Sequence, residues 1–164
     1  MRIISEDNFF RLGLREVLKI HDAGLREITI SLSSDLNTIR LYKNVSTYSN
    51  ERYFILNCLA GFILSHQLSD GLTILHHNLF KLIAEEKTTY LTPREIDVMR
   101  ALLKGNNVTD ISRLRGLSPK TISAQKSSAL RKLKVSNLTM LHRDLEIFKS
   151  LFYNERDGHK NADL

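Results

Sequence analysis

Two helix starts in the second half of the chain constrain its fold more than any other sequence feature. Residues 92–95 (TPRE) have the form of a capping box, in which a threonine cap precedes a proline and a glutamate follows three residues after the cap. Residues 118–119 (SP) again place a cap before a proline. Apolar residues at helical spacing follow both starts. The sequence therefore predicts one helix that ends near residue 105 and another that extends to about residue 134.

Two further helices complete this region. Residues 109–115 are expected to form a short helix in which Ile111 and Leu114 face inward, and residues 116–117 (GL) then form a turn. A last helix is expected to begin after residue 136 or 137 and to extend to about residue 152. A short helix, a turn that contains glycine and a second helix are the elements of a helix-turn-helix unit.

The first half of the chain alternates short strand-like runs with helical patterns. Strands are predicted at residues 2–5, 27–32, 44–47 and 61–64, and helices at residues 8–21, 36–42, 51–58 and from residue 69 or 70 to about 84. Alternation of this kind predicts an α/β layer with a parallel sheet. The sequence thus divides into an α/β domain at 1–86, a polar linker at 87–91, an all-α four-helix domain at 92–153 and a polar tail at 154–164 that is expected to be disordered.

Positive charge is concentrated in one segment. Residues 1–86 carry 9 Lys/Arg and 10 Asp/Glu, whereas residues 94–143 carry 11 Lys/Arg and 3 Asp/Glu, a net charge of +8. A local positive field favours a polyanion such as DNA, although a solvated basic surface is the plainer interpretation.

Composition excludes several classes of protein. A single cysteine, Cys58, rules out an internal disulfide framework and a cysteine metal cluster, and it is typical of a reducing cytoplasm. The longest apolar runs are too short to span a bilayer, and the N-terminus shows no signal-peptide pattern. The adjacent residues His76 and His77 point in different directions on a helix, so they make a poor metal site. No nucleophile elbow or phosphate-binding glycine loop is present, so no enzyme activity, cofactor or metal is expected.

The outer face of the third predicted helix is small, polar and cationic. At about 100° per residue, the apolar side chains fall on one side, which must pack on the first two helices: Ile122, Ala129, Leu130 and Leu133. The opposite side carries Lys120, Ala124, Ser127, Ser128 and Arg131, with Thr121 and Ser123 on its flanks. Small residues let a helix enter the major groove, and serine and threonine can bond base edges. Such three-helix units also occur in proteins that do not bind DNA, so a purely structural role stays open at this point.

Cations on the same helix are placed for the phosphates of DNA. These are Lys120, Lys126, Arg131 and Lys132. Lys126 lies toward the buried side, and its alkyl stem is expected to extend along the core toward a phosphate.

Residues 91–137, LTPREIDVMRALLKGNNVTDISRLRGLSPKTISAQKSSALRKLKVSN, resemble the LuxR/FixJ-type helix-turn-helix. They match the pattern LTxRExxVLxLxxxGxxxxEIAxxLxLSxxTVxxHxxxIxxKLxV nearly throughout. The resemblance implies that Ser123, Ala124 and Ser127 face bases, and that the DNA backbone is contacted by Lys120, Thr121, Lys126 and Lys132. Thr109 and Arg131 complete the expected DNA contacts. Asp110 stands where this family usually has glutamate, and Gln125 where histidine is frequent. The KTISxxK stretch is also similar to RcsA-like regulators.

The first half resembles a response-regulator receiver domain that is truncated and degenerate. Residues 5–18 are similar to a receiver's first loop and helix, and Glu6 and Asp7 match its acidic pair. Ser31 stands at the position of the acceptor aspartate and Ser65 at the position of the lysine. Without a carboxylate nucleophile no aspartyl phosphate can form, so control by phosphorylation is not expected. The acidic pair is interpreted as a loop or helix cap, with metal binding as the alternative.

The fourth predicted helix carries an apolar stripe of Leu141, Leu145, Phe148 and Phe152. Part of it must pack within its own domain, and Leu145, Phe148 and Phe152 are expected to form a dimer interface. Helix-turn-helix proteins commonly bind DNA as dimers on half-sites.

These features predict a cytoplasmic bacterial transcription regulator that binds duplex promoter DNA and is not an enzyme. Its expected partners are DNA, a second copy or another regulator, and RNA polymerase, but no membrane. The alternative is an interaction adaptor that forms a heterodimer with a fuller response regulator and adds little DNA affinity of its own. An enzyme that uses the front domain is a third, weaker reading.

Overall fold

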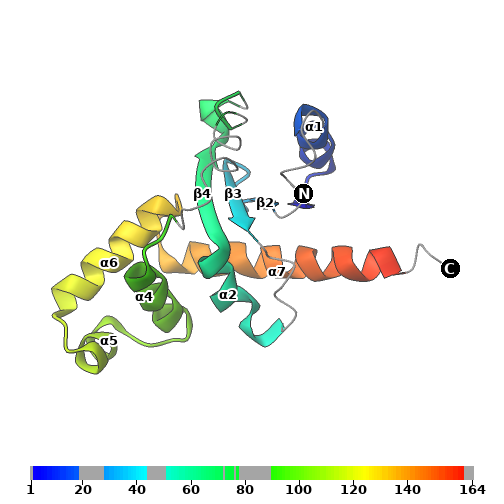
Figure 1. Ribbon diagram of the computed structural model, residues 1–164. Helices are drawn as coiled ribbons and strands as arrows, with labels where there is room; N and C mark the ends of the chain where they lie inside the picture. The colour runs from blue at the N-terminus through cyan, green and yellow to red at the C-terminus, as the bar shows by residue number, and fades with distance from the viewer. Residues whose placement is uncertain are drawn as a thin grey trace.

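The computed structural model describes residues 2–18, 28–43, 51–71, 73–75, 77 and 90–160. A small sheet with short helices forms the front part of the molecule, and the helices of the second half lie beside it (Figure 1). The predicted combination of an α/β part and an all-α part is confirmed.

Within the described residues, four strands form one mixed sheet. They are β1 (Arg2–Ile4), β2 (Ile28–Leu32), β3 (Thr38–Lys43) and β4 (Phe62–Gln67), in the order β1-β2-β3-β4. β1 pairs with β2 in parallel, and β2–β3 and β3–β4 are antiparallel. The parallel sheet that the sequence predicted is therefore wrong for two of the three strand pairs.

The helix predicted at residues 36–42 is also wrong, because this segment is strand β3. The backbone N–H of Ser33 donates to the Thr38 carbonyl (2.8 Å), and Leu36 adopts a left-handed conformation (φ 57°). This tight turn folds β3 back on β2 as a hairpin, which supplies non-local hydrogen bonds that helical spacing alone does not reveal. The antiparallel hairpin departs from the parallel sheet of a doubly wound fold, so the resemblance to a receiver remains a prediction.

α1 and α2 accompany the sheet in the part of the chain that the structure describes. α1 (Asn8–Leu18) follows β1, and α2 (Phe54–Gly61) follows a single 3₁₀ turn at Glu51–Tyr53. Both agree with the sequence, as do the strands at β1, β2 and β4. The strand predicted at 44–47 lies outside the described residues. So does most of the helix predicted from 69 or 70 to 84, at whose start Leu68–Asp70 forms a 3₁₀ turn.

The second half contains the four expected helices, α4 (Pro93–Leu103), α5 (Val108–Arg115), α6 (Pro119–Lys132) and α7 (Leu138–Lys160). α7 continues to Lys160, so the polar sequence from residue 154 is helical as far as that residue. Disorder was expected there from composition alone. Residues 161–164 lie outside the described residues.

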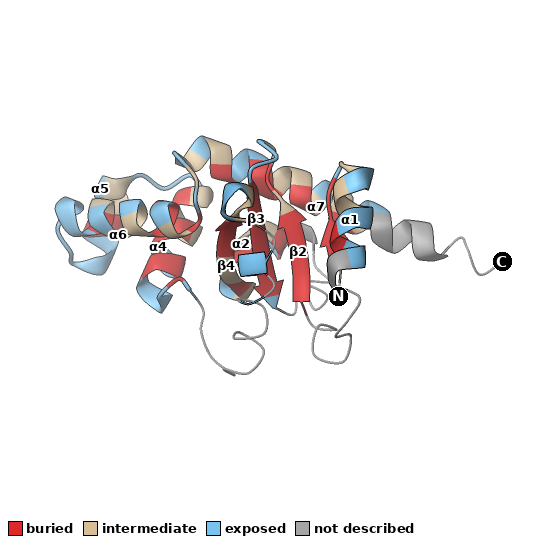
Figure 2. Ribbon diagram, turned by 90° about the horizontal axis from the view of Figure 1, so that it is seen from above, coloured by how far each residue is buried: buried red, intermediate tan, exposed pale blue. Residues whose placement is uncertain are grey.

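One continuous core joins the two halves. α7 runs past the sheet and α2, and buried residues line the contact between them (Figures 1 and 2). The buried cluster includes Tyr42, Phe54 and Phe62 from the front part together with Phe148 and Phe152 from α7. Leu91, which the sequence placed in the linker, is completely buried in this cluster. Residues 87–89 of that linker lie outside the described residues.

Candidate nucleic-acid interface

α6 begins with an exposed first turn. The hydroxyl of Ser118, the N-cap residue, accepts a hydrogen bond from the Thr121 backbone N–H (3.1 Å), and Pro119 occupies the first helical turn. A serine cap satisfies one of the backbone donors that have no partner within the helix, and proline fits where no donor is needed. Lys120 and Thr121 are both exposed in this turn. The beginning of α6 is thus well formed and open to solvent.

The inner face of α6 holds it against the other helices. Ile122, Ala129 and Leu130 are buried in the same cluster as Val98 and Met99 of α4. These apolar side chains fix which face of α6 points outward. The orientation that helical periodicity predicted for α6 is therefore confirmed.

The outward face of α6 is a stripe of four exposed residues, which we call the α6 stripe: Lys120, Ala124, Ser127 and Arg131. They are spaced by three or four positions, so they lie on one side of the helix. The stripe is small at its centre and cationic at both ends. Such a surface can approach the floor of a groove while its ends reach the walls.

The other expected DNA contacts lie at the margins of this stripe or beyond it. Ser123 and Lys126 are half-buried on α6, and Thr109 is exposed near the start of α5. Half-burial of Lys126 agrees with the expected packing of its stem. Ser128, expected on the outer face, is also half-buried, and its hydroxyl hydrogen-bonds to Glu95 of α4. Ser128 therefore belongs to the contact between α4 and α6.

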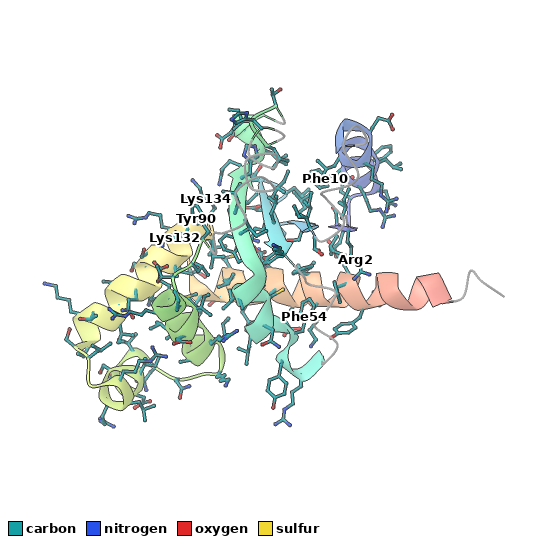
Figure 3. All side chains as sticks on the ribbon, viewed as in Figure 1. Arg2, Phe10, Phe54, Tyr90, Lys132 and Lys134 are labelled. Atoms are coloured by element: carbon teal, nitrogen blue, oxygen red, sulfur yellow. The ribbon has the colours of Figure 1, made fainter. Side chains whose placement is uncertain are left out.

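Lys132 makes an ion pair within the chain. Its ammonium nitrogen lies 2.8 Å from Oε2 of Glu95, the glutamate of the predicted capping box. The same Glu95 oxygen accepts from the Thr92 backbone N–H (2.7 Å), which confirms the capping box. Burial alone would raise the pKa of Glu95, but the hydrogen bonds from Lys132 and Thr92 lower it to about 2. Lys132, which is labelled in Figure 3, thus joins the end of α6 to the start of α4, and its expected contact with a DNA phosphate remains a prediction.

Two leucines are exposed near the junction of α5 and α6, one at the end of α5 and one in the turn that follows. Gly116 has φ 61°, a left-handed conformation that glycine adopts without strain, and it ends α5. Leu114 is 80% exposed, so the expectation that it faces inward is wrong. α5 is short and buries only one narrow face, through Ile111 and Ser112, which leaves Leu114 on the open side. Leu117 in the turn is 41% exposed.

The three side chains expected at a dimer interface are buried within the chain. Leu145, Phe148 and Phe152 are at most 3% exposed. The ring of Phe148 stacks on Tyr42 of β3 (5.0 Å between centroids), and Phe152 packs against Phe54 of α2 (5.0 Å). Figure 3 shows Arg2 and Phe54 along α7, and the guanidinium of Arg2 lies 4.6 Å from the centre of the Phe152 ring. The front part therefore covers this stripe, and none of it is free for a second copy in this conformation.

A polar network that sequence reasoning missed lies at the same junction. Arg40 of β3 is 3% exposed and pairs with Asp144 of α7, with 2.8 Å between Nη1 and Oδ2. Arg40 and Ser65 both donate to the carbonyl of Leu133 at the end of α6 (3.1 Å each). Asp144 carried a usable signal, because it falls on the same helical face as Leu141 and Phe148. Arg40 carried none, since a strand gives no indication of which distant helix it will meet.

The structure describes three residues that align with the receiver site, Asp7, Ser31 and Ser65. Asp7 caps α1, since its Oδ1 accepts from the backbone N–H groups of Phe9 (2.8 Å) and Phe10 (3.1 Å). The interpretation of the acidic pair as a helix cap is thus confirmed for Asp7. Ser31 is buried in β2, and Ser65 is engaged with Leu133.

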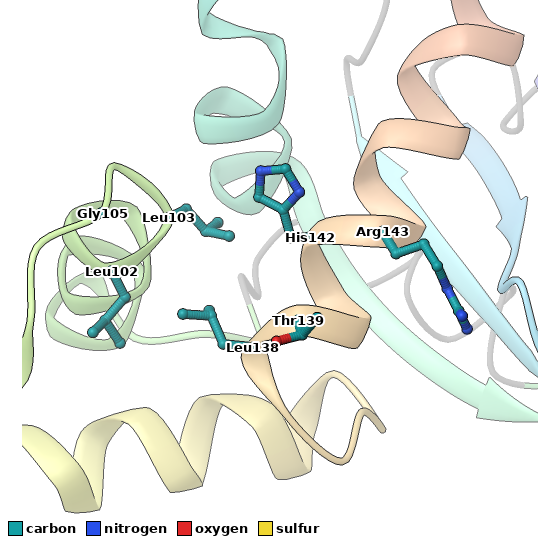
Figure 4. A pocket seen from close by; sticks show the side chains of 7 residues that line it. All are labelled: Leu102, Leu103, Gly105, Leu138, Thr139, His142 and Arg143. Carbon is teal, nitrogen blue, oxygen red and sulfur yellow. The ribbon is translucent and has the colours of Figure 1, made fainter.

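A groove of about 450 Å³ lies between the end of α4 and the first half of α7 (Figure 4). Its lining is mainly aliphatic: Leu102, Leu103, Gly105, Leu138, Thr139, His142 and Arg143. Arg143 donates to the Ser34 hydroxyl (3.0 Å) and so is partly turned toward the sheet.

No set of three or more metal-ligating side chains comes together within the part of the chain that the structure describes. Burial raises the pKa of the Cys58 thiol, which keeps it in the unreactive protonated form. His77 is exposed, and His76 lies outside the described residues. Over the same described ranges, none of the helices has the length and apolar character needed to cross a bilayer.

Comparison with known proteins supports the helix-turn-helix. The GerE family model, which represents bacterial regulatory proteins of the LuxR family, matches residues 89–143, a segment that spans α4, α5, α6 and the start of α7. No curated protein and no solved structure matches the chain. The matched segment contains the whole α6 stripe together with the turn at Gly116. The chain therefore carries a helix-turn-helix domain of the LuxR family of DNA-binding transcription regulators.

Proposed function

We propose that the chain regulates transcription by recognising specific sequences in duplex promoter DNA with the exposed face of α6. The observation that supports this most strongly is the α6 stripe, which is open to solvent along the full length of the helix. A function of this kind requires access to chromosomal DNA, so we expect a cytoplasmic protein without enzyme activity.

Base recognition would use the centre of the stripe and its flank. Ala124 and Ser127 are small enough to let α6 enter a major groove about 12 Å wide. The hydroxyls of Ser123 and Ser127 can donate to or accept from base edges, and the Ala124 methyl can contact a thymine methyl. These three residues are therefore the expected source of sequence preference.

Phosphate contacts would come from the cations at the ends of the stripe. Lys120 lies in the first turn of α6 and Arg131 in the last, and Lys126 lies between them on the flank. Each phosphate that such a cation neutralises releases counterions and adds to the salt dependence of binding. Lys132 is already paired with Glu95, so we expect its contribution to DNA binding to be smaller than that of Lys120.

We further propose that no phosphorylation step controls this function. Ser31 offers no carboxylate nucleophile, and its burial at 3% exposure leaves little access for a phosphodonor. Treatment with acetyl phosphate followed by intact-mass measurement should show no added phosphoryl group. A stoichiometric adduct would contradict this part of the proposal.

A dimer, formed with a second copy or with another regulator, would supply a second recognition helix, and contact with RNA polymerase would link binding to transcription. Because Leu145, Phe148 and Phe152 are covered by the front part, a dimer of the conformation described here would have to use another surface. Sedimentation of the full chain with and without duplex DNA would show whether it associates.

The deciding experiment measures binding of the full chain to a duplex selected by the wild type from a randomised pool, with fluorescence anisotropy at several salt concentrations. Lys120→Ala should weaken binding on every sequence and lower the salt slope by about one. Ser127→Ala should instead change which duplex is preferred. Lys43→Ala is the matched control, because Lys43 is exposed on β3 of the front part.

Two outcomes would contradict the proposal. If Lys120→Ala and Lys43→Ala have equal effects on the salt slope, α6 is not the DNA-binding surface. If the wild type selects no duplex from the pool, the adaptor that forms a heterodimer with a fuller regulator becomes the better account.

A further inference from the structure

The C-terminal end of α6 is held by side chains of the front sheet. Leu133, the C-cap residue of α6, is completely buried. Its carbonyl oxygen accepts from Nε of Arg40 on β3 and from the hydroxyl of Ser65 on β4, at 3.1 Å each. The last carbonyls of a helix lack partners within the helix and carry the negative end of its dipole. A buried cation and a hydroxyl therefore fix the C-terminal end of α6, the helix proposed to bind DNA.

Arg40 also holds α7 through the second arm of its guanidinium. Nη1 of Arg40 lies 2.8 Å from Oδ2 of Asp144, and both side chains are almost completely buried. The other oxygen of Asp144 accepts from the Ser34 backbone N–H (3.3 Å) and from the Ser34 hydroxyl. The planar guanidinium presents its donors in a fixed fork, so it can hold two partners in one geometry. Arg40 thus sets α6 and α7 against the sheet at a single point.

We propose that Arg40, Ser65 and Asp144 are positioning residues for DNA recognition, and that the conformation with α6 docked on the sheet is the one that binds DNA. The proposal rests on the proposed function, and it assigns the front part the role of orienting α6.

Exposure of the α6 stripe supports this assignment. All four of its residues, Lys120, Ala124, Ser127 and Arg131, are exposed while the end of the helix is docked. Figure 1 shows the end of α6 near β4 and its beginning pointing away from the sheet. A front part that inhibited DNA binding by occlusion would cover this stripe. Docking in this chain therefore leaves the recognition surface free.

The length of α6 explains why docking at one end matters at the other. A helix of 14 residues is about 21 Å long, so a tilt of about 5° at Leu133 moves its first turn by roughly 2 Å. Hydrogen bonds from short side chains such as Ser123 and Ser127 fail over such a displacement. Long side chains such as Lys120 can follow a phosphate over the same distance. Loss of the anchor should therefore reduce discrimination between sequences more than it reduces affinity for DNA in general.

Four variants of the full chain test the proposal. Arg40→Met combined with Asp144→Leu removes the buried pair without leaving a lone buried charge. Ser65→Ala removes one hydrogen bond to Leu133, and Arg40→Lys keeps the charge but loses the fork. Arg15→Met is the matched control, because Arg15 is exposed on α1. Each variant is measured by anisotropy against the duplex selected by the wild type and against a scrambled duplex, with thermal melting in parallel.

The proposal predicts that the double variant loses at least about tenfold in the ratio of specific to scrambled affinity, while its scrambled affinity changes by less than about threefold. Arg40→Lys and Ser65→Ala should lose a smaller part of the ratio, and Arg15→Met none. If the double variant does not fold, the test rests on Ser65→Ala and Arg40→Lys. If both then keep the wild-type ratio of specific to scrambled affinity, the proposal is overturned. If the wild type discriminates between the two duplexes and every variant discriminates equally well, the positioning role is overturned but the proposed function is not. A wild type that binds no duplex overturns the proposed function as well.

Discussion

The two halves of this chain are specified by contacts of different range. In the helical half, each helix from α4 to α6 starts at a side-chain cap and ends in a turn made by neighbouring residues. The backbone N–H groups of Gly105 and Asn106, for example, donate to Leu102 and Ala101 at the end of α4. In the front half, β3 is fixed by hydrogen bonds to β2 and β4, and α2 has no side-chain cap. Local signals therefore define the helical half, whereas tertiary contacts define β3 and α2 of the front half.

This difference explains which sequence predictions held. Residues 92–95 and 118–119 each contain a helix cap followed by proline, which is a local signal for the start of a helix. The helices predicted from them are confirmed. The helix predicted at residues 36–42 is wrong, although Thr38, Ile39 and Tyr42 are residue types that favour strands. The competing signal was the turn at residues 33–37, which commits the chain to a hairpin.

The candidate site divides in the same way. The exposed face of α6 follows from periodicity, because the apolar side must be buried and the opposite side of the helix is then exposed. The pairing of Lys132 with Glu95 and the docking of Arg40 on Leu133 join residues far apart in the chain, and no local pattern encodes them. The burial of Phe148 and Phe152 under the sheet could not be predicted either, since an apolar stripe does not say what covers it.

The largest expected effect comes from breaking the core between the halves. Phe148→Ala removes the ring that stacks on Tyr42 and contacts Phe54, and it should lower the free energy of unfolding by about 4 kcal/mol. Chemical denaturation followed by circular dichroism would measure this loss. Two separate transitions in the wild type, only one of which responds to the variant, would show that the halves unfold independently.

A slightly smaller effect is expected at the buried pair. Arg40→Met alone strands the Asp144 carboxylate in the interior, so it should cost about 3 kcal/mol. Adding Asp144→Leu should recover most of this loss, because no lone charge is then buried. A double variant as unstable as the single one would mean that packing, and not the ion pair, governs this junction.

In the helical half, the ion pair of Glu95 with Lys132 can be tested by changing the pH. The pKa of Glu95 is about 2 in the folded chain against 4.5 for an unperturbed carboxyl, so ionised Glu95 stabilises the fold above about pH 4.5. This contribution, about 3 kcal/mol, should be lost as the pH falls from about 4.5 to 2. Urea unfolding of the wild type and of Glu95→Gln between pH 2 and 7 would measure it. A difference that does not shrink below about pH 4.5 would contradict the role given to the Lys132 ion pair.

The smallest expected effects are at the helix ends. Gly116 and Lys134 both adopt left-handed conformations, with φ 61° and 55°. Gly116→Ala should therefore destabilise the chain by about 1 kcal/mol, and Lys134→Gly should stabilise it by roughly 0.5 kcal/mol. Thermal melting of both variants would check the opposite signs. If both variants changed the stability in the same direction, tertiary contacts would determine these helix ends, as they determine β3 in the front half.

The central claim is that α6 binds DNA through its exposed stripe while docked on the sheet, and Ala124→Glu tests it most directly. Ala124 lies in the middle of the stripe, so a glutamate there would meet the negative field of DNA and fill the space that a groove requires. The control is Ser150→Glu, which adds the same charge at an exposed position on α7. The account predicts that Ala124→Glu lowers affinity for the selected duplex at least about 100-fold at an unchanged melting temperature, while Ser150→Glu changes it less than about threefold. Equal affinity of Ala124→Glu and Ser150→Glu would contradict it.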